Sequence, residues 1–387
     1  MRSPVVQPVA YADPWNQPLS ERLAMLTRSR RRIAYFYETP NNSTFRYRAY
    51  NMAQVLNAEE SGGISASYFF RSDYASFDDI ADYADTLVIC RSRYNAELSH
   101  LVAKFRARNR RVLFDIDDLV FDPSYTRLVV NTLGLDAYDD LVWDSWFAMT
   151  SRLGAALAMC DGAITTNDFL AERIRAYSGL PVRVVPNFLN REQMEISNRV
   201  YAQRVDSKFS RDGRIRLGYF SGSPSHRLDF AVVEQALVDA MNDNEELELV
   251  VVGYIEPTDA ITRLARRVHK VPFQDYVNLQ SVIGAVDINL MPLQANTFTD
   301  CKSELKFFDA AVVGTLSIAS PSATYKAVVQ HGVNGYIARA HEWKTTIDAA
   351  CECIGNYAEL AANARATAME RFVWTTQRPA VIEALDA

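Results

Sequence analysis

Long apolar runs, paired cysteines and an excess of basic charge are all missing from this sequence of 387 residues. No stretch of about 18 consecutive apolar residues occurs, so the sequence predicts no transmembrane helix. The N-terminus has no apolar core of the kind found in a secretory signal. The formal net charge of −6 provides no general attraction to polyanions, and we expect no nucleic-acid partner.

Cysteine is scarce, with five residues, and no two of them have CxxC spacing. This pattern is typical of reduced thiols in a cytoplasmic protein, and it predicts neither a disulfide framework nor a zinc site. We therefore expect no bound metal and no cofactor. A basic run at residues 28–32 could contact the inner face of a membrane, although the end of a solvated helix is the simpler explanation.

Short apolar segments alternate with amphipathic ones along most of the chain, which is typical of α/β folds with parallel sheets. A polar stretch at residues 190–213 separates two such series and is expected to be a linker. We predict two Rossmann-like, doubly wound domains that face each other across a cleft. The expected parts are an N-terminal arm (1–30), a first domain (31–200), a second domain (201–365) and a C-terminal helix (366–387) that could return to the first domain.

The first candidate site is a turn rich in glycine and serine at residues 218–227, between a predicted strand and a predicted helix. Gly222 would allow a backbone with positive φ, and amide groups at such a turn favour a phosphate. The candidate phosphate contacts here are Gly222, Ser223, His226 and Arg227. Because such turns are common, this one alone does not distinguish a phosphate site from an ordinary connection.

The second candidate site lies at residues 296–309. Ser303 is expected to cap the helix that follows, and the free amides between Lys302 and Lys306 would attract an anion. Asp309 could accept hydrogen bonds from ribose hydroxyls, as carboxylates do in Rossmann domains. An amphipathic helix with exposed charges is the alternative for this segment alone. Two such loops in one domain favour nucleotide binding.

Residues 215–340 resemble the donor domain of glycosyltransferase family 4, which has the GT-B architecture. The resemblance rests on the order of segments 218–226, 249–253, 271–273, 285–293, 302–309, 314–320 and 332–336. It implies that Asp309 binds the donor ribose. Members often carry a glutamate near the start of the 302–309 stretch that touches the donor sugar, and Lys302 stands there in this chain. A subset of bacterial enzymes of surface-polysaccharide assembly is similar in this respect. By resemblance, the nucleobase is flanked by Val271, Pro272 and Phe273, and the diphosphate lies near Lys302, Ser303 and Glu304.

Three acidic residues, Asp115, Asp117 and Asp118, follow a predicted strand of the first domain. They could bind a divalent metal, polarise hydroxyl groups or cap the next segment. The strand–DxD pattern also resembles haloacid-dehalogenase phosphatases, in which the first aspartate attacks phosphate and the second acts as acid and base. In the glycosyltransferase interpretation these residues are catalytic candidates that face the cleft. Asp117 then aligns with a histidine that contacts the donor sugar in many family members.

Four further residues could lie at the cleft. Arg46 and Arg48 open the helix expected at residues 44–56, and Arg91 ends a strand. Each could bind the donor diphosphate or an anionic acceptor, and a structural ion pair is an equally simple role. Asn187 follows the last strand of the first domain and could line the cleft.

The combined expectation is a hexosyl- or deoxyhexosyltransferase. It would move a sugar from a nucleoside-diphosphate donor to a hydroxyl of a glycan or lipid-linked glycan. Lys302 and Lys306 could stabilise the leaving diphosphate without a metal. The resemblance implies retention of anomeric configuration and a role in bacterial surface polysaccharide. The alternatives are a non-catalytic sugar-nucleotide-binding protein or assembly subunit, and a phosphatase that uses Asp115 and Asp117.

Overall fold

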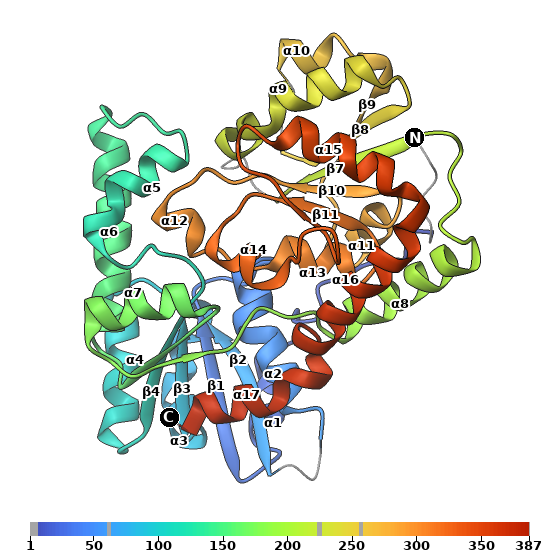
Figure 1. Ribbon diagram of the computed structural model, residues 1–387. Helices are drawn as coiled ribbons and strands as arrows, with labels where there is room; N and C mark the ends of the chain where they lie inside the picture. Colours follow the sequence, from blue (N-terminus) through green and yellow to red (C-terminus); the bar gives the residue numbers. More distant parts are fainter. Residues whose placement is uncertain (1–6, 60–62, 223–226, 255–257, 387) are drawn as a thin grey trace.

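The computed structural model describes residues 7–59, 63–222, 227–254 and 258–386. It shows two α/β lobes, one built mainly by the first half of the chain and the other by the second half (Figure 1). Each lobe contains a six-stranded parallel sheet with helices packed around it. The predicted fold class, two doubly wound parallel-sheet units followed by a helical tail, is confirmed.

The first sheet has the spatial order β2-β1-β3-β4-β5-β6, and all neighbouring strands are parallel. Strands β3 and β5 in its middle are buried at every residue, as expected for a parallel sheet covered by helices. The strand order reverses between β1 and β3, and α/β proteins bind ligands at the carboxyl ends of such a pair. The strands are β1 (Arg31–Tyr37), β2 (Ile64–Phe70), β3 (Thr86–Cys90), β4 (Arg111–Ile116), β5 (Gly162–Thr165) and β6 (Val182–Val184).

The second sheet has the order β12-β11-β10-β7-β8-β9, again with parallel neighbours. Its order reverses between β7 and β10, so the loops after these two strands flank the expected ligand position. Those loops carry the two sequence segments proposed to bind phosphate. The strands are β7 (Ile215–Ser221), β8 (Leu247–Gly253), β9 (Val268–Val271), β10 (Ile288–Met291), β11 (Leu316–Ala319) and β12 (Tyr336–Ile337), the last of which was not predicted.

The helices of the first lobe are α1 (Leu19–Leu26), η1 (Arg46–Tyr50), α2 (Asn51–Leu56), η3 (Arg71–Ser76), α3 (Phe77–Tyr83), α4 (Ala96–Ala107), η4 (Pro123–Tyr125), α5 (Thr126–Thr132), α6 (Asp140–Leu157) and α7 (Asp168–Ser178). Those that follow are α8 (Arg191–Asp206), α9 (Arg227–Asp243), α10 (Asp259–Thr262), η6 (Ala265–Arg267), α11 (Asn278–Ile283), α12 (Thr297–Asp300), α13 (Leu305–Ala311), α14 (Ala323–Val328), α15 (Trp343–Glu352), η7 (Cys353–Asn356), α16 (Tyr357–Arg371) and α17 (Trp374–Asp386). No helix within the described ranges has both the length and the apolar character needed to cross a membrane.

Two segments differ from the sequence-based expectation in a way that affects the site. The polar stretch at 190–213 is mostly helical, because α8 starts after Asn190, whose side chain accepts a hydrogen bond from the Gln193 amide. The helix expected at 44–56 contains a π-helical segment, η1. Such segments change the direction of side chains and are frequent at functional sites. Here η1 carries Arg46 and Arg48 into the protein interior.

The chain crosses between the lobes at two places that are hydrogen-bonded to each other. The Leu189 amide donates to the Phe372 carbonyl at 2.8 Å, and the Trp374 amide donates to the Leu189 carbonyl at 2.9 Å. Beyond this junction α17 returns to the first lobe and packs against α2 (Figure 1). An ion pair between Arg31 and Asp386, with a nitrogen–oxygen distance of 2.7 Å, fixes its far end to β1. The end of the sequence therefore completes the lobe that its beginning builds.

Candidate functional site

The acidic residue Asp115 is at the carboxyl end of β4 and is fully buried. Arg48 donates to both of its carboxylate oxygens, from Nε at 2.7 Å and from Nη2 at 2.9 Å. Arg48 also donates through Nη1 to the Val185 carbonyl at 2.7 Å. Burial raises the pKa of Asp115, while the Arg48 guanidinium opposes that rise. The structure thus places these two residues in a saturated internal ion pair that is not available to substrate.

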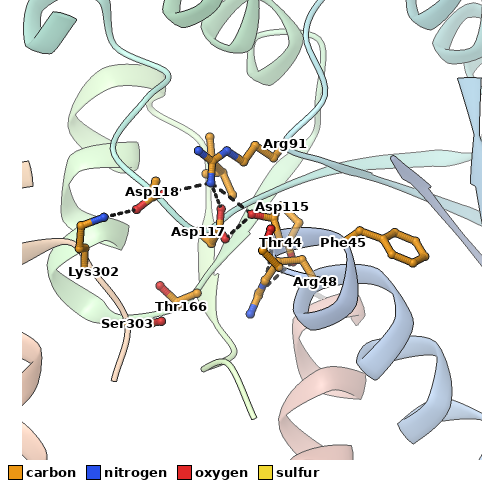
Figure 2. A network of polar contacts seen from close by, with 12 residues as sticks. Thr44, Phe45, Arg48, Arg91, Asp115, Asp117, Asp118, Thr166, Lys302 and Ser303 are labelled. Carbon is orange, nitrogen blue, oxygen red and sulfur yellow. Dashed lines mark hydrogen bonds and ion pairs between the residues drawn. The ribbon is translucent and has the colours of Figure 1, made fainter. Parts of the chain in front are cut away.

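Asp117 and Asp118 follow β4 and remain partly exposed, with 13% and 20% of their side-chain surfaces accessible. The Arg91 Nη1 donates to Asp117 at 2.8 Å and to Asp118 at 2.9 Å. Thr44 Oγ1, beyond the end of β1, donates to the second Asp117 oxygen at 2.8 Å. Figure 2 shows the Arg91 guanidinium against both carboxylates, with Lys302 on the other side of Asp118. The structure therefore brings these residues together at the β1/β3 switch point, as ligand geometry in an α/β sheet requires.

Lys302 is the part of the second lobe that reaches this acidic cluster. Its Nζ lies 3.6 Å from Asp118 Oδ1 and 4.5 Å from the centroid of the Phe298 ring. Next to it, Ser303 Oγ accepts a hydrogen bond from Asn187 Nδ2 at 3.0 Å. The two edges of the interlobe site are thus joined by an ion pair and a neutral hydrogen bond.

The prediction that Ser303 caps the next helix is wrong. Helix α13 starts at Leu305, its N-cap is Glu304, and no side chain caps it. Ser303 cannot serve as the cap because its hydroxyl is directed to Asn187 in the other lobe. The helix is short and ends at Ala311.

Two ionisable groups on this segment have buried atoms that find no hydrogen-bond partner in the described part of the chain. Lys306 Nζ is one, and it lies 4.9 Å from the centroid of the Tyr219 ring of β7. Glu304 Oε2 is the other. Burial lowers the pKa of Lys306 to about 8 and raises the pKa of Glu304 to about 7. Buried charged groups are costly unless paired, so a missing partner beside the β7/β10 switch point suggests the position of a ligand.

Asp309 is on α13 and is buried within a small set of polar side chains. Its Oδ1 accepts long hydrogen bonds from Gln280 Nε2 at 3.3 Å and from Gln193 Nε2 at 3.4 Å. Arg46 Nη1 donates to the other end of the Gln193 amide at 2.6 Å. Burial raises the pKa of Asp309 to about 7, with opposition from Arg46. Asp309 is thus held in place by neutral amides, without a direct cation partner in the described chain.

The loop after β7 is only partly described. Ser223 and His226 lie outside the described residues, and Arg227 begins α9. Gly222 is exposed, and its φ is not in the left-handed region, so the positive φ that a glycine allows is not used there. A glycine is required instead at Gly253, which pairs with Ser221 and has a φ of 92°, in the left-handed region. A Cβ atom there would lie 2.0 Å from the Ser221 carbonyl oxygen, so no larger residue fits.

The residues expected to flank a base lie at the end of β9. Phe273 is half exposed, and its ring centroid is 5.5 Å from that of Tyr254, which follows β8 and is also half exposed. Val271 ends β9, and Pro272 separates it from this aromatic pair. A pair of accessible rings at the carboxyl ends of adjacent strands can stack on a planar ligand.

Several residues of the site were not identified from the sequence. Thr44 contacts Asp117, and Gln193 and Gln280 hold Asp309. Asn167, the N-cap of α7, also crosses between the lobes and donates to the Cys301 carbonyl at 2.9 Å. Only Asn167 had a local signal, because it directly follows a predicted strand and precedes a predicted helix.

Comparisons with known proteins agree with this geometry. Residues 215–356 match a family model described as Glycosyl transferases group 1. No curated protein matches the chain. None of the comparisons supports a phosphatase, and an attacking nucleophile at Asp115 is incompatible with its burial against Arg48.

Several solved structures share the fold. HepE of Anabaena in complex with UDP and glucose has 16% identity and a TM-score of 0.59, covering 92% of this chain and 99% of that one. Sucrose-phosphate synthase from Thermosynechococcus elongatus has 14% identity and a TM-score of 0.59, covering 92% and 98%. WaaG, described as a glycosyltransferase involved in lipopolysaccharide biosynthesis, has 13% identity and a TM-score of 0.59, covering 92% and 100%. The chain therefore has the GT-B fold, and its second lobe carries the match to Glycosyl transferases group 1.

Proposed function

We propose that this chain is a glycosyltransferase that uses a nucleoside-diphosphate sugar as donor. The observation that carries the proposal is the buried Lys306 Nζ beside the β7/β10 switch point of the lobe that matches glycosyltransferases, which has no hydrogen-bond partner among the described residues. A diphosphate is the kind of ligand that would give this ammonium group its missing partner. HepE, which has the same fold, was crystallised with UDP, with UDP and glucose, and with UDP-glucose.

The donor would lie along the edge of the second lobe. Phe273 and Tyr254 would stack on the base, and Asp309 would accept hydrogen bonds from the ribose. Lys302 and Lys306 would contact the diphosphate, with Ser303 and Glu304 beside it. The proposal also assigns Ser223, His226 and Arg227 to contacts with the diphosphate, as their sequence segment suggests.

Transfer would break the bond between the anomeric carbon and the diphosphate oxygen and form a bond to the acceptor oxygen. The two lysines stabilise the negative charge that develops on the leaving diphosphate, and no metal is needed in this scheme. The departing diphosphate takes the proton of the acceptor hydroxyl on the same face of the sugar, which retains the configuration. Asp117, with Asp118 beside it, presents negative charge from the first lobe toward the oxocarbenium-like carbon.

The acceptor would be a hydroxyl of a glycan or of a lipid-linked glycan in bacterial surface-polysaccharide assembly. The protein would work in the cytoplasm, with peripheral contact to the inner membrane face. WaaG, with the same fold, is described as acting in lipopolysaccharide biosynthesis, which supports this context.

The proposal is tested in two steps with the purified full chain. A panel of nucleoside diphosphates and nucleotide sugars is screened by thermal shift, and at least one should raise the melting temperature. That donor is then incubated with and without glycan acceptors, and sugar transfer is followed by mass spectrometry. Binding without any transfer would indicate a binding protein or assembly subunit. If no nucleoside diphosphate stabilises the chain, the proposal is wrong.

A further inference from the structure

Arg91 directly follows β3 and has a backbone conformation that few residues adopt. Its φ is 37°, in the left-handed region, which is uncommon for a residue with a side chain. Its amide donates to the Asp115 carbonyl at 2.7 Å, so that this backbone is tied to the adjacent strand β4. Strained conformations of this kind are found mainly at active sites and switches, where neighbouring structure holds them.

The consequence of this conformation is the direction of the guanidinium. A single nitrogen, Nη1, donates to Thr44 Oγ1 at 3.2 Å, to Asp117 at 2.8 Å and to Asp118 at 2.9 Å. Two carboxylates on consecutive residues repel each other unless a cation lies between them. Arg91 is that cation, and Figure 2 shows it in contact with both. Thr44 completes the arrangement, because it donates to the Asp117 oxygen that Arg91 does not reach.

We infer that Arg91 is a positioning residue that holds Asp117 toward the cleft and separates its charge from that of Asp118. This inference rests on the proposed glycosyltransferase function and deepens it. It assigns the Nη1 of Arg91 to three acceptors within the protein, so a contact of Arg91 with a diphosphate or an anionic acceptor would have to use another nitrogen of the guanidinium.

The matched control is Arg93, two residues farther along the same loop. Its Nη2 lies 2.5 Å from Glu38 Oε2 in an ion pair at the surface, and its side chain is 44% exposed. Arg91→Gln and Arg93→Gln therefore remove the same charge from the same loop, but only the first removes contacts to Asp117. With the wild-type donor and acceptor, we expect Arg91→Gln to lower kcat at least 10-fold and to change nucleoside-diphosphate affinity less than 2-fold. Arg93→Gln should change neither value more than 2-fold.

A double-variant cycle separates positioning from direct catalysis. If Arg91 acts through Asp117, Arg91→Gln combined with Asp117→Asn should be no slower than Asp117→Asn alone. Losses in kcat that multiply in the double variant would show an independent role and overturn the inference. If Arg91→Gln lowers nucleotide affinity as much as it lowers kcat, Arg91 binds the donor directly, and the inference is likewise overturned.

A second pair of variants separates activity from folding. Arg91→Gly relieves the left-handed backbone, whereas Arg91→Ala keeps it, so the glycine variant should melt about 2 °C higher. Both should lose the same fraction of kcat if the guanidinium positions Asp117. If the activity loss follows the melting temperature, Arg91 is a structural residue only. If the wild-type chain transfers no sugar from any nucleotide donor, the proposed function fails first and Arg91 loses its role with it.

Discussion

The two edges of the interlobe site have opposite electrostatic designs. On the first edge, the three aspartates at and after the end of β4 each have a cation from the protein: Arg48 for Asp115, and Arg91 for Asp117 and Asp118. On the second edge, Lys306 and Glu304 have buried atoms without a hydrogen-bond partner among the described residues, and Asp309 accepts long hydrogen bonds from two neutral amides. The charges of the first edge are thus neutralised within the protein, whereas the buried polar atoms of the second edge would gain their partners from a ligand. Binding free energy should therefore come mainly from the second lobe, and the first should mainly orient the reacting groups.

The largest effect on stability is expected from removing the buried ion pair of the first edge. Asp115→Ala leaves the fully buried Arg48 guanidinium without a counter-charge, which should lower the free energy of unfolding by about 3–5 kcal/mol. Urea unfolding measures this loss. Glu38→Ala, which breaks the exposed pair with Arg93, is the control and should cost less than about 1 kcal/mol. Equal losses in both variants would mean that the Asp115 pair is no more important than a surface contact.

A substitution on the second edge should lower the affinity for the ligand and leave the stability of the protein largely unchanged. Lys306→Met should weaken nucleoside-diphosphate binding by roughly 30- to 100-fold at pH 7, because a charge-assisted contact is lost. Burial lowers the pKa of Lys306 to about 8, so wild-type affinity should fall as the pH rises above 8 and the variant should not share that fall. Isothermal titration calorimetry at several pH values tests both statements. Lys326→Met, on the exposed side of α14, serves as control, and a similar loss there would contradict the assignment.

Substitution of Asp309 should lower the affinity for the ligand and raise the stability of the protein. Burial raises its pKa to about 7, so between its ordinary pKa and 7 the native chain holds a proton that the unfolded chain releases. Wild-type stability should therefore decline as the pH rises through this range. Asp309→Asn removes the penalty and should stabilise the protein by roughly 1–2 kcal/mol at pH 8, with no gain at pH 4. Unfolding curves at the two pH values measure this difference.

The same variant should bind a nucleoside diphosphate about 10-fold more weakly, since an amide cannot accept both ribose hydrogen bonds. Affinity equal to wild type would remove Asp309 from the ribose site, even if the stability prediction is correct.

The smallest effect concerns the ion pair that joins the two edges. Asp118 lies 3.6 Å from Lys302 and competes with a diphosphate for it. Asp118→Asn should therefore tighten nucleoside-diphosphate binding by about 2- to 5-fold, and added salt should reduce the difference. Asp144→Asn, an exposed position on α6, provides the control for the change in net charge. Weaker binding in Asp118→Asn would show that this carboxylate supports the donor site instead of opposing it.

The contrast between the edges also explains what the sequence could predict. All strands except β12, and the two loops of the second lobe, were predictable because apolar runs and their polar ends are local patterns. Partners were not, because they come from distant parts of the chain: Arg48 and Asp115 are 67 residues apart, and Gln193 and Asp309 are 116 apart. The π-helical turn that directs Arg48 inward has no local signature. Gly222 was singled out because it lies in a turn rich in glycine and serine. Gly253 is required by the pairing of β7 with β8, and only the structure reveals that pairing.

Helix α17 has a consequence for the order in which the protein can be made. It covers α2 of the first lobe with residues from the far end of the sequence, and Val381 and Leu385 are buried there. During synthesis the first lobe leaves the ribosome long before this helix does, so its α2 face stays uncovered until the second lobe has been translated. A fragment that stops at residue 190 would keep that apolar face open permanently. The first lobe is therefore a separate unit in the folded structure, but it cannot be completed until α17 has been synthesised.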